Sequence, residues 1–69
     1  METKKVYSLH IGGSAYGNGG RFKYFNNAAD RDKEFSNTHK MDCPDRGEFD
    51  AVVINGELYY PTSKITLET

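Results

Sequence analysis

The stretch FDAVVINGELYY, residues 49–60, predicts a β-hairpin and decides the fold. Apolar and aromatic residues flank Asn55-Gly56, which is the strongest short-range signal for a two-residue type I′ turn. A two-residue turn fixes the register, so Ile54 faces Glu57, and Pro61 ends the second strand because proline cannot donate to the ladder. The pattern places Phe49, Ala51, Val53, Leu58 and Tyr60 on one face of the hairpin, and Val52, Ile54 and Tyr59 on the other.

A second hairpin is predicted nearer the start of the chain. Residues 4–11 and 21–25 alternate as strands and flank a glycine-rich segment, residues 12–20. Either Asn18-Gly19 forms the turn and sets Ala15 opposite Phe22, or residues 12–20 form a wide mobile loop. With the turn, the core face carries Tyr7, Leu9, Ile11, Phe22 and Tyr24, and the other face carries Ser8, His10, Ser14, Tyr16, Arg21, Lys23 and Phe25.

A helix is expected between the two hairpins. Asn27 is a suitable N-cap, with Asp30 at the third helical position, as in a capping box. The apolar stripe of this helix is thin, so it should pack lightly on the sheet and end before a loop at 41–47. With a short fifth strand possible at 64–68, the order β-β-α-β-β predicts an α+β fold, a small antiparallel sheet with one helix on one face, in a single domain, residues 1–69.

Composition narrows the function classes. Nine Lys and Arg against ten Asp and Glu give a net charge of −1, which argues against a nucleic-acid coat protein. No run approaches the roughly 18 apolar residues of a membrane helix, and no apolar signal-peptide segment follows Met1. Cys43 is the sole cysteine, so an intrachain disulfide is excluded and a reducing compartment fits best. We therefore expect a cytoplasmic protein.

The small number of aliphatic residues predicts a homo-oligomer. Five Tyr and four Phe supply much of the available apolar surface. A chain this short buries only about 60% of its surface, so small domains often depend on a partner subunit. The side chains expected to project away from the core, and hence to form the interface, are Val52, Ile54, Tyr59 and Phe25.

Catalytic and metal-binding patterns are missing from the sequence. No serine stands in a Gly-x-Ser-x-Gly elbow, and Cys43 with His39 is a weak nucleophile–base pair. His10, His39 and Cys43 lack the spacing of zinc ligands. The glycines of residues 12–20 match neither the dinucleotide-binding nor the phosphate-loop pattern. The sequence predicts a protein that is not an enzyme and needs no metal and no cofactor.

A binding site for an anionic ligand is the main functional hypothesis. An arginine can grip a phosphate with two parallel hydrogen bonds, and a neighbouring aromatic ring can stack on a base. A nucleic-acid ligand is less well supported. In a strand over residues 21–25, the two cations lie on one face and two of the three aromatic side chains lie on the other. The expected ligand-binding residues are Arg21, Lys23 and His10 for phosphate, with Tyr16, Tyr59 or Phe25 for a base.

In size and layout the chain resembles the small accessory proteins that bacteriophages make to bind host factors. This resemblance involves no motif and implies stoichiometric binding in the host cytoplasm. One hypothesis is an oligomer that sequesters a nucleotide-like ligand. The alternative is an inhibitor that docks on a host or defence protein, as anti-restriction and anti-CRISPR proteins do. A further alternative is a structural domain of a larger assembly.

Overall fold

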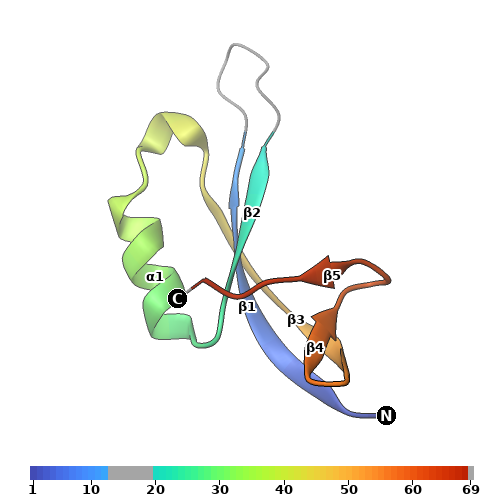
Figure 1. Ribbon diagram of the computed structural model, residues 1–69. Helices are drawn as coiled ribbons and strands as arrows, with labels where there is room; N and C mark the ends of the chain where they lie inside the picture. Colours follow the sequence, from blue (N-terminus) through green and yellow to red (C-terminus); the bar gives the residue numbers. More distant parts are fainter. Residues whose placement is uncertain (13–19, 69) are drawn as a thin grey trace.

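The computed structural model describes residues 1–12 and 20–68 and shows one helix packed on a five-stranded antiparallel sheet (Figure 1). This confirms the predicted α+β class. The strand order in space is β2-β1-β3-β4-β5. Along the chain the elements are β1 (Thr3–Ile11), β2 (Arg21–Phe25), α1 (Ala28–Asn37), the short 3₁₀ helix η1 (Lys40–Asp42), β3 (Asp45–Ile54), β4 (Glu57–Tyr59) and β5 (Lys64–Ile65).

The second hairpin has the register that its turn predicted. Asn55 and Gly56 both have positive φ, at 53° and 79°, as a type I′ turn requires. Ile54 lies opposite Glu57 and Val53 lies opposite Leu58. The turn residues alone were therefore sufficient to fix the pairing of β3 with β4.

The first hairpin has a different register from the one that a turn at Asn18-Gly19 would set. Ile11 lies opposite Arg21 and His10 lies opposite Phe22, so the predicted pairing of Ala15 with Phe22 is wrong. The expected turn itself lies outside the described residues. The shift is an odd number of residues, which exchanges the faces. Phe22 and Tyr24 consequently share a face with Ser8 and His10, and Arg21, Lys23 and Phe25 share the face of Leu9.

Strand β3 begins at Asp45, inside the segment 41–47 that was expected to be a loop. Its first half is rich in charged residues and lacks an apolar alternation, so the sequence gives no strand signal there. Strand β1 nevertheless pairs with it continuously, from Thr3 opposite Val52 to His10 opposite Asp45. The long partner strand, and not local preference, extends β3.

The sheet buries side chains on both of its faces, whereas the sequence predicted a single core face. On one face Leu9 is fully buried and Phe25 is 7% exposed. This is the face of α1, because the Arg31 guanidinium lies over the ring of Tyr7, which alternates with Leu9. On the other face the buried cluster is Val6, Ala51 and Ile65, with Tyr24, Phe49, Leu58 and Leu67 packed against it.

The C-terminal segment returns to the far edge of the sheet. In Figure 1 it crosses the strands from β5 towards the side where α1 lies. Leu67 forms a parallel bridge with Tyr24 of β2, and the Glu68 N–H donates to the Tyr24 carbonyl at 2.6 Å. The first and last strands of the sheet are thereby connected, which encloses the cluster around Val6.

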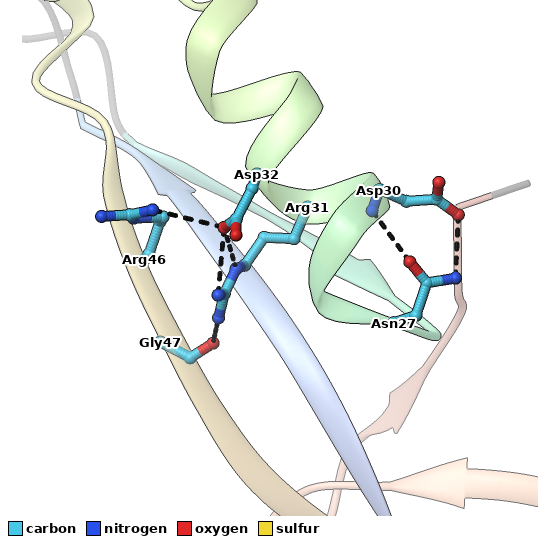
Figure 2. A network of polar contacts seen from close by, with 6 residues as sticks. All are labelled: Asn27, Asp30, Arg31, Asp32, Arg46 and Gly47. Carbon is cyan, nitrogen blue, oxygen red and sulfur yellow. Dashed lines mark hydrogen bonds and ion pairs between the residues drawn. The ribbon is translucent and has the colours of Figure 1, made fainter.

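The start of α1 follows the predicted capping pattern. The Asn27 side-chain oxygen accepts a hydrogen bond from the Asp30 N–H at 2.8 Å, and its amide nitrogen donates to the Asp30 carboxylate at 3.1 Å (Figure 2). The cap fixes where the helix begins. It does not attach the helix to the sheet, since α1 contains no buried residue.

Arg31 makes that attachment. Its Nη1 donates to the Gly47 carbonyl of β3 at 2.8 Å (Figure 2). Its guanidinium lies 5.3 Å from the centre of the Tyr7 ring. On the other side of the guanidinium, the Arg31 Nε–H donates to the Asp32 carboxylate at 3.1 Å. The Arg31 side chain is 13% exposed, so these contacts are largely shielded from water. A cation thus joins helix and sheet where an apolar side chain would be usual.

Replacement of Arg31 tests this attachment. Arg31→Ala should lower the free energy of unfolding by about 1–3 kcal/mol, because a charge-assisted hydrogen bond is lost. Arg31→Lys should restore little, since lysine cannot bond Gly47 and Asp32 with one planar group. Lys33→Ala, at an exposed position of the same helix, is the control and should change stability little. Equal denaturant midpoints for Arg31→Ala and Lys33→Ala would contradict this role.

The turn of the second hairpin gives another prediction. A Cβ added at Gly56 would meet no atom within 4 Å, so any effect of substitution comes from the positive φ alone. Gly56→Val should therefore lower the free energy of unfolding by about 1–3 kcal/mol. Gly56→Asn should cost less, because asparagine tolerates the left-handed region. Equal melting temperatures for the two variants would show that backbone strain does not decide stability here.

Candidate functional site

The two cations expected to hold a phosphate lie on the helix side of β2. Lys23 is largely buried there, with Nζ 3.2 Å from the Glu34 carboxylate of α1. Arg21, two residues earlier, is exposed. His10 projects from the opposite face of the sheet, next to Phe22. The structure therefore keeps Arg21 and Lys23 on one face but does not bring His10 to them, and Tyr16 lies outside the described residues.

Tyr59, the expected stacking residue, is separated from β2 by β1 and β3. Its hydroxyl donates to the Glu57 carboxylate at 3.0 Å, and Lys64 Nζ lies 3.3 Å from the same carboxylate. These contacts lower the pKa of Glu57, and the hydrogen bond to Glu57 raises the pKa of Tyr59. An ionised carboxylate beside the ring makes this an unfavourable place for an anionic ligand.

The residues expected to form an oligomer interface are placed in two groups. Phe25 is 7% exposed and belongs to the core beneath α1, so little of its ring is available to a partner subunit. Val52 and Tyr59 lie opposite each other, and Ile54 projects on the same face with 51% exposure. These three side chains form a small apolar surface at the turn end of the second hairpin.

The residues considered for catalysis stabilise the turn around η1. The His39 ring Nδ1 accepts a hydrogen bond from the Met41 N–H at 3.1 Å, which occupies the lone pair a general base would use. Cys43 is exposed and directs its thiol to the Met41 carbonyl at 3.9 Å. Within residues 1–12 and 20–68, no three metal-binding side chains lie together. The same residues include no helix with the length and apolarity needed to cross a bilayer.

An unbroken line of aromatic rings crosses the face opposite α1. We call it the aromatic row. The ring centres of successive members are separated by 4.6, 6.1, 5.7 and 4.0 Å. The first three separations are typical of attractive aromatic pairs, and the last pair is stacked more closely. The strands β1, β2 and β3 and the residue that follows β4 contribute its members, which are, in order, His10, Phe22, Tyr24, Phe49 and Tyr60.

Small residues make the central contact of the aromatic row possible. Ser8 of β1 lies between Tyr24 and Gly47 in the register, and its side chain is buried. Because Ser8 and Gly47 fill little space above the sheet, the rings of Tyr24 and Phe49 meet edge to face across β1, at an interplanar angle of 87°. Tyr24 and Phe49 also pack against the core cluster. The middle of the row is therefore held by the fold.

Two members of the aromatic row are open to solvent. Phe22, next to His10 at one end, is 56% exposed, and Tyr60 at the other end is 45% exposed. Sequence reasoning missed this surface because the assumed turn register placed His10 and Phe22 on opposite faces. The sequence does show that Phe22 and Tyr24 share one face of their strand and that Phe49 lies on a strand. Placing the three rings on the same face of the sheet, however, requires the observed pairing of β1 with β2.

Comparison with protein-family models, with curated proteins and with solved structures found no match to this chain. The site must therefore be judged from its own geometry.

The contact of Tyr59 with Glu57 can be tested by titration. The raised pKa of Tyr59 means that the native fold favours the neutral phenol, a contribution lost as the pH rises through that pKa. Glu57→Gln should move the ionisation of Tyr59 to lower pH in a spectrophotometric titration. Tyr59→Phe identifies the part of the curve that belongs to this residue. Superimposable curves for the wild type and Glu57→Gln would contradict the contact.

Proposed function

We propose that this protein is a non-enzymatic binding protein that acts stoichiometrically by docking its aromatic row on another protein. The observation that carries the proposal is the continuous line of rings, of which Phe22 and Tyr60 are exposed. Aromatic side chains are enriched among the residues that dominate protein–protein affinity. Apolar side chains that lie next to one another on a surface point to an interaction site, whereas a singly exposed apolar residue does not.

The construction of the aromatic row favours a protein partner. Its middle is held by the core, so little conformational entropy is lost when a partner covers it. The hydroxyl groups of Tyr24 and Tyr60 and the ring nitrogens of His10 provide polar positions along an otherwise apolar surface. Rigid rings with polar tips are typical of interface anchors.

A nucleotide-like ligand has weaker support. Phosphate recognition combined with stacking needs cations beside the rings. Arg21 and Lys23 project from the opposite face of β2, and Lys23 is paired with Glu34. The sequestration hypothesis stays a prediction, with Arg21 as the exposed cation of its expected set.

We place this activity in a reducing compartment, for which we propose the cytoplasm. The observation in favour is Cys43, whose thiol is free and exposed. Exposed thiols of this kind persist where glutathione and thioredoxin keep them reduced.

Paired variants separate the two binding hypotheses. Tagged protein is purified from cells that express it, and native mass spectrometry reports bound proteins and retained small molecules together. A protein bound at fixed stoichiometry should be lost in Phe22→Ser and in Tyr60→Ser, while Arg21→Glu should keep it. Arg21→Glu should keep a melting temperature near the wild-type value, because the position is exposed. Phe22→Ser and Tyr60→Ser each lose ring contacts and should melt a few degrees lower, so circular dichroism at the working temperature establishes that each is folded.

The opposite pattern would overturn the docking proposal. A small anionic molecule that is retained by the wild type and by Phe22→Ser, but is lost in Arg21→Glu, would support ligand sequestration. Turnover of a substrate in excess over the protein would contradict a non-enzymatic function.

A further inference from the structure

Among residues 1–12 and 20–68, no strand lies beside one side of β3 over most of its length. Strand β1 pairs with β3 from Asp45 to Val52, but β4 pairs only with Val52, Val53 and Ile54. In the described part of the chain, no strand therefore pairs with the outer side of residues 45–51. We call this the open edge. Figure 2 shows its upper part at Arg46 and Gly47, where β3 forms the border of the sheet.

The direction of the backbone groups on the open edge follows from the ladder with β1. The Val53 N–H donates to the Glu2 carbonyl at 3.0 Å, so Val53 bonds towards β1. Bonding alternates along an antiparallel pair, and every second residue back to Asp45 therefore also bonds towards β1. The backbone N–H and C=O groups of Arg46, Glu48 and Asp50 consequently point outward. Such an unpaired row is a template for another strand.

We propose that the open edge pairs with the open edge of a second copy of this chain, forming a twofold symmetric dimer with one continuous sheet. An antiparallel pairing of identical strands about Glu48 sets Arg46 opposite Asp50 of the partner subunit, and the reverse. Each of these opposed pairs, and the pair of Glu48 with its own copy, exchanges two backbone hydrogen bonds. The outward groups of both strands are then satisfied.

The charges fit this register, which also pairs all three outward residues of each strand. Arg46 and Asp50 carry opposite charges two residues either side of Glu48, so the twofold axis creates two cross-strand ion pairs. The two Glu48 carboxylates meet at the axis, and each already has Lys5 Nζ at 3.6 Å. The side chain of Arg46 is 48% exposed, and its contact with Asp32 is long, at 3.4 Å. Its guanidinium also lies over the Phe35 ring of α1, 4.4 Å from the ring centre, and the exposed part of the group is accessible to a second carboxylate.

The opposite face of the strands fits the same register. Gly47 comes to lie opposite Phe49 of the partner subunit, and an aromatic ring across from a glycine is a favourable cross-strand pair. The dimer proposed here does not use the apolar surface of Val52, Ile54 and Tyr59 that the sequence suggested as the oligomer contact. The dimer does not rest on the proposed docking function, because backbone hydrogen bonds and ion pairs make its main contacts, and the two surfaces share only Phe49.

Charge reversal tests the pairing by sedimentation velocity at high micromolar concentration. The wild type should be a dimer. Arg46→Asp places two acids opposite each other, and Asp50→Arg places two bases opposite each other, so each variant alone should be monomeric. An equimolar mixture of the two should form a heterodimer, because every opposed pair then has opposite charges. Glu2→Arg and Lys33→Asp, charge reversals away from the open edge, should leave the dimer intact.

Three results would overturn the proposal. One is a monomeric wild type, which would mean that the open edge takes no second copy. Another is a dimer that both single variants retain, which would place the contact elsewhere, and Ile54→Asp would then test the apolar surface at the second hairpin. The third is a mixture of folded single variants that stays monomeric. Circular dichroism of each variant establishes that it is folded.

Discussion

Polar contacts hold the helix on the sheet, and the Arg31 side chain, which donates to the Gly47 carbonyl, is the least exposed of the cations that make them. Helix α1 has no buried residue, so apolar packing alone holds it weakly. The guanidinium binds the backbone of β3, lies over Tyr7 and is held in place by Asp32. With α1 fixed in this way, Leu9 and Phe25 are covered. A planar cation with several donors can make all these contacts at once, and no other side chain in the helix could.

The sequence predicted one hairpin in detail and left two alternatives open for the other. At Asn55-Gly56 the turn has two residues, so turn chemistry fixes the register of β3 and β4. In the first hairpin nine residues separate Ile11 from Arg21, and a connection of that length does not determine the pairing. Pairing is then chosen by packing on both faces, through residues such as Phe25 and Tyr24, which a local pattern does not reveal.

The register of the first hairpin also decided how the candidate site was predicted. Alternation correctly grouped Arg21 with Lys23, since it depends only on position along one strand. The grouping of His10 with these cations needed the register between two strands, and it was wrong. Strand β3 shows the complementary case. Its charged first half gives no local strand signal, yet Asp45 to Glu48 is ordered by pairing with β1. The open edge is therefore a consequence of tertiary pairing that composition conceals.

The aromatic row and the open edge meet at Phe49. Its ring belongs to the row, and its backbone belongs to β3. In the proposed dimer the twofold axis is perpendicular to the sheet, and this symmetry preserves the faces of both subunits. The two aromatic rows then lie on the same side of one continuous sheet, with the helices on the other side. A symmetric partner could contact both rows at once, and the second contact would form at a high effective concentration. Dimerisation would in this way increase the affinity of a surface that is small in a single subunit.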